Sequence, residues 1–326
     1  MRMDSKTGIF IGIDLGGTNV RAGAVTPDGE LLHWRDTTIE AARGPEAGLR
    51  KIIELVGEVL KQVNRPVVAV GIGSTGPLDR RRGRIQNPYT LPGWEDVDIV
   101  GPIQRQLGVP VALENDAAAA ALGEAWVGAG RGVARMAMVT IGTGVGTSLI
   151  LNGEIYRGLG DEHPEGGHIV IDPSGPECYC GGRGCWESLV SGPAIARLAR
   201  AAPDLKSSIL YAACEGSEEK IDASMVFDAA RQRDRLCEQI VARTAEYIAL
   251  GLVSMMMLTL PDCIVLSGGV MRSFDLLEQR IRTTIVRHNT IIPAAQVNLQ
   301  PAALGQQAGI FGAARAAQIL SLETNR

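Results

Sequence analysis

One histidine and three cysteines lie close together near the middle of the sequence, as His168, Cys178, Cys180 and Cys185. One imidazole and three thiolates make up the ligand set of a tetrahedral zinc site. Because four protein ligands leave no open coordination position, the set predicts a structural Zn²⁺ and not a catalytic metal. Glycines within the segment, at 181, 182 and 184, would let the backbone turn around an ion.

Two carboxylates flank the four ligands. Glu165 lies three residues before His168, and Glu187 lies two residues after Cys185. A metal that holds both ends of the segment would also fix these two side chains. We therefore expect the ion to brace a binding site and to take no part in a reaction.

A disulfide and incidental buried thiols are the other interpretations of these cysteines. The residues that follow Met1 lead into an apolar segment without a signal peptide, which predicts a cytoplasmic protein with reduced thiols. Three thiols between residues 178 and 185 are too close in sequence to be incidental. The remaining cysteines have no partner spacing and are predicted to be core side chains: Cys214, Cys237 and Cys263.

Two segments repeat the pattern of apolar strand, glycine turn and return strand. Residues 9–14 lead into the turn Gly16, Gly17, Thr18 and Asn19, and residues 136–141 lead into the turn that holds Thr143 and Gly144. Backbone amides of such turns bind phosphate oxygens, so the pair predicts a polyanion site. Each turn returns to a strand and matches neither the P-loop nor the dinucleotide fingerprint.

Two further features could take part in binding a nucleotide and its metal ion. Asp14 ends the first apolar strand beside the first turn, where a carboxylate can hold Mg²⁺ directly or through water. A third glycine turn, at Gly268 and Gly269, follows the apolar residues 263–266. It could cover an adenine and ribose, or it could be an ordinary turn from a strand to a helix.

Asp116 lies between a short apolar strand, residues 109–113, and an alanine-rich segment, residues 117–126, which predicts a helix. Asn115 and Asp116 occupy the position of an N-cap, so Asp116 is either a helix cap or a general base. As a base at a helix N-terminus it would be kept ionised by the helix dipole. The residues alone leave both interpretations open.

The overall composition sets broad limits. The chain has 326 residues, enough for two domains, and 40 glycines, many of them at strand and turn positions where backbone approaches a ligand. A net charge of −4 gives no reason to expect a nucleic-acid partner. The sequence contains no run of 18 apolar residues, which predicts that it does not span a membrane.

Taken together and in order, these motifs resemble the ROK family of repressors, open reading frames and sugar kinases. The motifs that carry the resemblance are Asp14-Leu15-Gly16-Gly17-Thr18-Asn19, Glu114-Asn115-Asp116-Ala117, Glu165-Gly166-Gly167-His168, Cys178-x-Cys180-Gly181-x-x-Gly184-Cys185-x-Glu187 and residues 305–314. The resemblance implies an α/β fold, the duplicated actin-like and ribonuclease H-like fold of the sugar kinase, Hsp70 and actin group, with a cleft between two lobes. It implies a first lobe of residues 1–117 plus 306–326 and a second lobe of residues 118–305.

The resemblance also implies roles for individual residues. Asp116 would be the catalytic base, and the sugar would be bound by Asn115, Asp116, Glu165, His168, Glu187 and Thr90. The nucleotide and its Mg²⁺ would be bound by Asp14, Gly16, Gly17, Thr18, Asn19, Thr143, Gly144, Gly268 and Gly269. The zinc would be bound by His168, Cys178, Cys180 and Cys185.

Two departures from the family pattern lie on the sugar side. The family has an Asn before Leu-Pro-Gly-Trp, where this chain has Thr90 before residues 91–94. The family's early Gly-x-Pro-Gly turn is Gly-Ser-Thr-Gly-Pro here, at residues 73–77. Phosphoryl transfer is unaffected by these changes, whereas the identity of the sugar is not fixed.

The predicted activity is transfer of the γ-phosphoryl group of ATP to the 6-hydroxyl of a hexose, with glucose as the first candidate. An N-acetylhexosamine, such as N-acetylmannosamine or N-acetylglucosamine, is the alternative substrate within the family. A non-catalytic sugar-sensing regulator is the alternative of another class. It is disfavoured because the first phosphate strand begins at about residue 9, which leaves no room for a DNA-binding domain. The resemblance implies a homodimer, or a tetramer.

Overall fold

The computed structural model describes residues 8–324, which divide into two compact units. One unit combines the described parts of Met1–Ala134 and Ala302–Arg326 with Leu149–Tyr156, and the other combines Arg135–Ser148 with Arg157–Pro301. Two five-stranded sheets form the centre of the architecture. The fold is of the mixed α/β class, as predicted.

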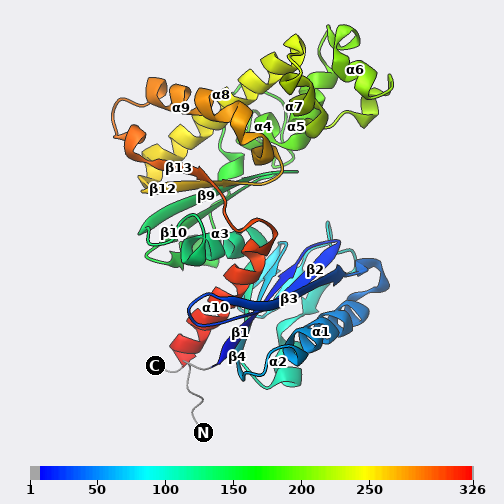
Figure 1. Cartoon of the computed structure of the whole chain (residues 1–326), viewed down its shortest axis with the longest axis vertical. Helices are drawn as coiled ribbons and strands as arrows, with labels where there is room; N and C mark the ends of the chain where they lie inside the picture. The colour runs from blue at the N-terminus through cyan, green and yellow to red at the C-terminus, as the bar shows by residue number, and fades with distance from the viewer. Residues whose placement is uncertain (1–7, 325–326) are drawn as a thin grey trace. The chain divides into compact units, whose positions relative to one another are not determined.

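The first sheet has the strand order β3-β2-β1-β4-β8, and β1, β2, β3 and β4 are labelled in Figure 1. β1, β2 and β3 form an antiparallel meander, β4 is parallel to β1, and β8 is parallel to β4. In chain order these strands are Ile9–Leu15, Asn19–Val25, Leu31–Thr38, Val67–Ser74 and Val111–Asn115.

The second sheet repeats this arrangement, with the order β11-β10-β9-β12-β13. β10 and β11 are antiparallel, β12 is parallel to β9, and β13 is parallel to β12. In chain order the strands are Arg135–Ile141, Val145–Leu151, Glu154–Ile155, Cys263–Ser267 and Asn298–Pro301. Each sheet has its first strand in the middle, so the predicted internal duplication is confirmed.

Helices cover both faces of the first sheet. α1 (Pro45–Lys61) and α2 (Val100–Leu107) contribute to a core with Ile9, Ile11 and Ile13, whereas α10 (Ala308–Thr324) packs in a separate core with Phe10. Successive side chains of a strand point to opposite faces, which explains why these neighbouring residues join different cores.

Two strand glycines are explained by helix packing. A Cβ atom added at Gly12 would lie 1.9 Å from the carbonyl oxygen of Ile310, and one at Gly71 would lie 1.8 Å from that of Ala313. α10 therefore approaches β1 and β4 at distances that exclude any side chain. The expectation that strand glycines serve a ligand does not hold at these two positions.

The remaining elements complete the two units. A small antiparallel sheet contains β5 (Leu78–Asp79), β6 (Arg84–Gln86) and β7 (Glu95–Asp98), and α3 spans Asp116–Val127. The second unit adds α4 (Trp186–Val190), α5 (Gly192–Arg200), α6 (Ile209–Ala213), α7 (Ala223–Arg231), α8 (Arg235–Thr259) and α9 (Phe274–His288).

The compact division differs from the predicted lobes because the predicted boundary at residue 117 falls inside α3, whereas the first unit holds the whole helix and continues to Ala134. α3 packs against α10 so closely that a Cβ at Gly312 would lie 1.6 Å from the carbonyl oxygen of Ala119. This contact joins segments that are far apart in sequence, which is why the local pattern did not reveal it. The functional roles of the two predicted lobes stay predictions.

Helix α8 is long and apolar enough to cross a membrane by length and composition, and 56% of its apolar window is buried inside the protein. Its buried face includes Gly251, where a Cβ would lie 2.0 Å from the indole of Trp186. Burial of this kind is typical of a core helix.

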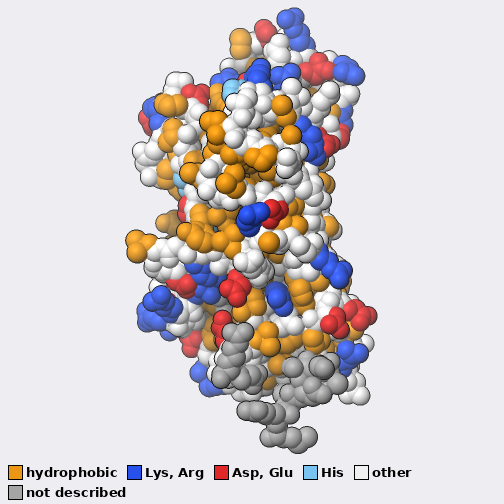
Figure 2. Space-filling model, turned by 90° about the vertical axis from the view of Figure 1, so that its left-hand side faces the viewer, with side chains coloured by type: hydrophobic (Ala, Val, Ile, Leu, Met, Phe, Trp, Pro, Cys, Tyr) orange, Lys and Arg blue, Asp and Glu red, His pale blue; other side chains and the backbone are white. Residues whose placement is uncertain are grey.

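On the face shown in Figure 2, basic and acidic side chains are interspersed.

Candidate functional site

The four predicted zinc ligands come together in the second unit. Their ligand atoms all lie within 4.8 Å of one another. The Sγ atoms of Cys180 and Cys185 are 3.6 Å apart, and Cys178 Sγ is 3.5 Å from His168 Nδ1. Zn–S bonds of about 2.3 Å and Zn–N bonds of about 2.0 Å place the corners of a tetrahedron about 3.5 to 3.8 Å apart. The donor set therefore fits Zn²⁺.

The orientation of the His168 ring assigns its two nitrogens different neighbours. Nδ1 faces the sulfur of Cys178, and Nε2 lies 3.1 Å from the hydroxyl of Tyr179, whose ring meets the imidazole edge-on. Nδ1 is thus the nitrogen available to a metal, and the predicted sugar contact of His168 would have to use Nε2. Burial, with a contribution from Glu187, raises the pKa of Tyr179 to about 12, so its hydroxyl is protonated at neutral pH.

The sulfurs of the cluster differ in acidity. Hydrogen bonds, first from the Gly182 backbone and then from Cys185 and Cys178, lower the pKa of Cys180. Burial raises the pKa of Cys185 to about 12, and the neighbouring sulfurs add to this effect. Metal binding would release the protons that these thiols share.

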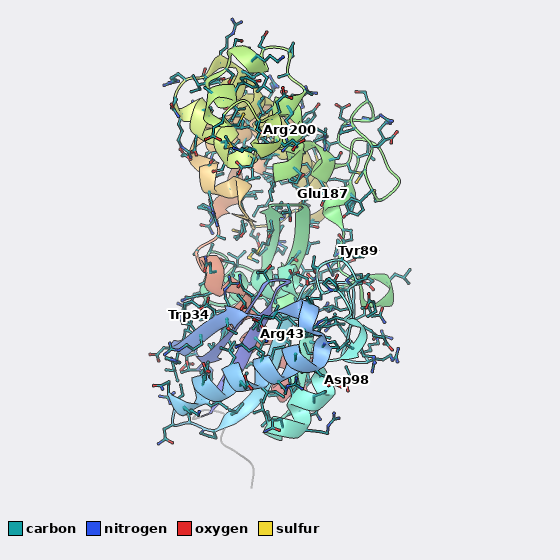
Figure 3. The ribbon with its side chains drawn as sticks, turned by 90° about the vertical axis from the view of Figure 1, so that its right-hand side faces the viewer. Trp34, Arg43, Tyr89, Asp98, Glu187 and Arg200 are labelled. Carbon is teal, nitrogen blue, oxygen red and sulfur yellow. The ribbon has the colours of Figure 1, made fainter. Side chains whose placement is uncertain are left out.

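Glu187 joins the metal-ligand segment to the second glycine turn. It lies in the first turn of α4, two residues after Cys185, and is labelled in Figure 3. Its Oε2 accepts a hydrogen bond of 2.8 Å from the backbone N–H of Val145. A Cβ at Gly144 would lie 2.5 Å from the same oxygen. The carboxylate is therefore held from both ends, by the cysteine segment and by the turn.

The close approach of Gly144 gives a test of this arrangement. The substitution Gly144→Ala would place a methyl group on Glu187 Oε2 and displace the carboxylate without straining the backbone. We expect normal folding and a loss of about 10- to 100-fold in kcat/KM for the sugar, because small misplacements of binding groups carry costs of this size. Steady-state kinetics with a melting curve measures both effects.

Gly57→Ala is the matched control, since nothing lies within 4 Å of its added Cβ on α1. An unchanged kcat/KM in Gly144→Ala would show that the position of Glu187 is unimportant.

The segment that carries Glu165 is fixed by its backbone. Thr147 Oγ1 donates to the carbonyl of Pro164 and accepts from the N–H of Gly166, both at 2.8 Å. The Glu165 side chain is 66% exposed and lies 3.5 Å from His163 Nε2. The carboxylate is therefore presented to solvent from a segment that Thr147 anchors on β10.

The second and third glycine turns share one edge of the second sheet. β9 and β12 are parallel neighbours with Thr140 opposite Ser267, so their carboxyl ends meet at that edge. Thr143 is exposed there, and Gly268 has a φ of +96° with its would-be Cβ 2.2 Å from the carbonyl oxygen of Ile141. Only glycine fits position 268, and the two predicted turns are adjacent.

The first glycine turn follows β1. The N–H of Gly16 donates to the carbonyl of Asn19 at 2.9 Å, which closes the turn and leaves Thr18 and Asn19 exposed. Asp14 lies opposite Arg21 across the hairpin, with 2.9 Å between Oδ2 and the guanidinium. Burial raises the pKa of Asp14, and Arg21 opposes this effect.

The raised pKa of Asp14 predicts a pH dependence of stability. A carboxyl with a raised pKa in the folded state stabilises the protein below its unfolded pKa, about 3.9, and this contribution is lost as pH rises through the folded value. Relative to Asp14→Asn, the natural protein should therefore lose unfolding free energy as the pH rises above about 4 and through the raised folded-state pKa of Asp14. Denaturant titrations of both proteins in EDTA would measure the difference. A difference that grows in favour of Asp14 with pH would contradict the assignment.

The junction between β8 and α3 shows which of Asn115 and Asp116 is the N-cap. Asn115 is the N-cap, and its Oδ1 accepts from the N–H groups of Ala117 and Ala118 at 3.0 and 3.2 Å. Asp116 is the first residue of the helix, and its Oδ1 accepts from Ala117 N–H at 2.8 Å. Asn115 is thus the N-cap and Asp116 lies in the first turn of the helix, whereas the role of Asp116 as a base stays a prediction.

Thr90 is exposed and belongs to a polar cluster that the sequence did not predict. Its Oγ1 lies 3.0 Å from Thr75 Oγ1 and 2.6 Å from the Nδ2 of Asn87, which is buried. A Cβ at Gly17 would lie 2.5 Å from the Thr90 carbonyl oxygen, so the cluster abuts the first glycine turn.

Several residues of the site were missed from sequence. Arg21 had a usable signal, because strand pairing across a short hairpin places it opposite Asp14. Gly309, at the start of α10, had none: a Cβ there would lie 2.5 Å from Asp14 Cγ, although nearly 300 residues separate them.

The duplicated sheets, each with a glycine turn after its first strand, place the chain in the actin-like and ribonuclease H-like fold group. The family model for the ROK family matches residues 10–319. The chain therefore belongs to the ROK family.

Relatives and solved structures agree with this assignment. A glucokinase from Thermotoga maritima is 37% identical over 309 residues, 94% of this chain and 96% of the relative. The ROK hexokinase of Thermus thermophilus has a TM-score of 0.81 at 30% identity, covering 97% of this chain and 99% of that one. A ROK family glucokinase from Streptomyces griseus, solved with glucose and AMPPNP, has a TM-score of 0.75 at 31% identity, covering 96% and 100%.

Proposed function

We propose that this ROK protein is an ATP-dependent hexose kinase that phosphorylates the 6-hydroxyl of glucose. Glucokinase relatives that match nearly the whole chain support this function, as does a similar structure with glucose and an ATP analogue. The observation that carries the proposal within this chain is the β8–α3 junction. Asn115 supplies the helix cap there, and Asp116 presents a carboxylate beside it.

In the proposed reaction, Asp116 accepts the proton of the sugar 6-hydroxyl as that oxygen attacks the γ-phosphorus of ATP. A new P–O bond forms to the sugar, the bond to the bridging oxygen of the β-phosphate breaks, and ADP leaves. Phosphoryl transfer depends on positioning and charge stabilisation more than on covalent catalysis, so one base and well-placed binding groups suffice.

The sugar contacts are assigned to side chains at the positions of the family motifs. Asn115 uses its Oδ1 in the cap, so it would offer a sugar hydroxyl its Nδ2 donor. Thr90 would also contact the sugar. Glu165 and Glu187 would accept hydrogen bonds from sugar hydroxyls, and His168 would contribute a contact through Nε2. These roles rest on matching the family motifs position by position.

The cofactors would be held by the glycine turns and the cysteine segment. Asp14 would hold Mg²⁺, which neutralises phosphate charge when bound. The phosphates and nucleoside would lie against Gly16, Gly17, Thr18 and Asn19 and against Thr143, Gly144, Gly268 and Gly269. Zn²⁺ would supply fixed bonds to His168, Cys178, Cys180 and Cys185 and would take part in no step.

An ADP-release assay with Mg-ATP tests the function across glucose, mannose, fructose, allose, N-acetylglucosamine and N-acetylmannosamine. We expect sugar-dependent turnover with the highest kcat/KM on glucose. A preference for an N-acetylhexosamine would identify the alternative kinase. Binding of a sugar without ADP release would support the sugar-sensing regulator and contradict the kinase.

Three further sequence predictions complete the proposal. We propose a homodimer, or a tetramer, located in the cytoplasm, with neither nucleic acid nor membrane as a partner. Sedimentation of the purified protein tests the oligomeric state, and fractionation of cells tests the location.

A further inference from the structure

The two departures from the family pattern are in contact with each other. Thr75 belongs to the first departure, at residues 73–77, and Thr90 to the second, before residues 91–94. Their Oγ1 atoms lie 3.0 Å apart. We call these two residues the threonine pair. Two changes that are separate in sequence thus form one feature in the structure.

A buried amide fixes the threonine pair. The Oδ1 of Asn87 accepts from the backbone N–H groups of Tyr89 and Thr90 at 2.9 and 3.0 Å. Because backbone N–H groups only donate, these bonds settle which end of the amide is oxygen. The Nδ2 group donates one proton to the Thr90 hydroxyl oxygen at 2.6 Å. Its other proton is shared between the hydroxyl and carbonyl oxygens of Thr75, at 3.1 and 3.3 Å. Asn87 is fully buried and acts as a positioning residue.

Counting protons and lone pairs shows what the threonine pair can offer. Two hydroxyls carry two protons and four lone pairs. Two lone pairs accept from Asn87, and the bond between the hydroxyls uses one proton and one lone pair. One O–H donor and one acceptor site remain. That combination matches two neighbouring sugar hydroxyls, one of which donates while the other accepts.

The threonine pair also lies beside the proposed sugar groups of the first unit. Ser74, which precedes Thr75, is opposite Asn115 in the pairing of β4 with β8. A Cβ at Gly76 would lie 3.5 Å from Asn115 Nδ2. Thr75 is half-buried and Thr90 is exposed, whereas Tyr89 between Asn87 and Thr90 extends at the surface (Figure 3).

We propose that the threonine pair recognises two neighbouring hydroxyls of the hexose and thereby sets sugar preference. This inference rests on the proposed function, because it takes the sugar to bind on this side of Asn115. The family pattern has a proline at position 75, which would have no side-chain donor or acceptor, and an asparagine at position 90. The threonine pair therefore exists only because the chain departs from the pattern at both positions.

The test combines threonine variants with deoxy sugars. Calorimetry would measure the affinities of glucose and its 2-, 3- and 4-deoxy analogues, and the ADP-release assay would measure kcat/KM for each. The proteins are the natural chain, Thr75→Val, Thr90→Val and the double variant. Thr283→Val is the matched control, an exposed threonine on α9 whose hydroxyl bonds the Gln279 carbonyl. A melting curve of each variant verifies folding.

In the natural protein, removal of either of two adjacent hydroxyls should weaken binding roughly 3- to 10-fold, the usual size of one lost hydrogen bond. The double variant should bind glucose more weakly, by a similar factor for each of the two sugar hydroxyls. It should bind glucose and the two deoxy sugars that lack one of these hydroxyls with equal affinity. Thr283→Val should retain the discrimination.

Other outcomes overturn the inference. If the double variant weakens binding of glucose and of every deoxy sugar by one common factor, the pair is structural and recognises no particular hydroxyl. An unchanged deoxy pattern overturns it as well, and absence of sugar binding by the natural protein overturns both proposals. Sugar binding without turnover contradicts only the kinase, because the affinities still test the threonine pair.

Discussion

Asp116→Asn should reduce kcat by about 10²- to 10⁴-fold, the usual contribution of a positioned general base. An amide cannot accept the proton of the attacking hydroxyl, whereas its oxygen can still accept the N–H of Ala117. Asn115 provides the helix cap in either case, so the melting temperature should be unchanged. The KM for the sugar should change little, because size and polarity are conserved.

The measurement is a comparison of kcat, KM and melting temperature with the natural protein. Asp275→Asn is the matched control, since Asp275 is also an acid in the first turn of a helix, α9. It should retain full activity. If Asp116→Asn keeps most of its turnover, Asp116 is not the base.

Loss of the metal should have the second large effect. Cys185→Ala removes a buried ligand of the four-residue set and should abolish stoichiometric zinc binding. Where free Zn²⁺ exceeds its Kd by about 1,000-fold, binding contributes about 4 kcal/mol to stability. We therefore expect the melting temperature to fall by roughly 6 °C, because unfolding a chain of 326 residues has an entropy of about 0.7 kcal/mol per degree. The KM for the sugar should rise, because Glu187, two residues after Cys185, loses one of its two anchors and keeps only the hydrogen bond from Val145.

Cys214→Ala is the matched control, because Cys214 is as buried as Cys185 but lies outside the cluster. Metal analysis of the purified proteins should give one zinc for the natural chain and the control and none for Cys185→Ala. A full complement of zinc in Cys185→Ala would refute the ligand set. Equal sugar KM values in zinc-loaded and metal-free protein would refute the bracing role.

The local chemistry of the site could be predicted from the sequence. The four metal ligands were predicted from residue type and spacing, and their ligand atoms do come together. The duplication followed from two strand-turn-strand segments, each of which is a hairpin held by local pairing. Such features depend on neighbours within a few residues, so the sequence carries them directly.

The identity of the helix cap needed the structure. The sequence placed both Asn115 and Asp116 at the start of a helix, and only backbone geometry showed that Asn115 is the cap. The link from Glu187 to Val145 spans more than 40 residues and depends on how the first turn of α4 meets the start of β10. Contacts of this kind arise when the chain collapses, and no local pattern encodes them.

By itself, the sequence determined the family motifs, the four residues of the predicted zinc set, the glycine turns and the class of reaction to test. Tertiary structure alone decided that α3 packs with α10 in the first unit, and that Thr75 and Thr90 meet over the buried Asn87. The physical reason is the same in each case. Residue types fix which bonds a side chain can make, whereas packing between distant segments fixes which partner it meets.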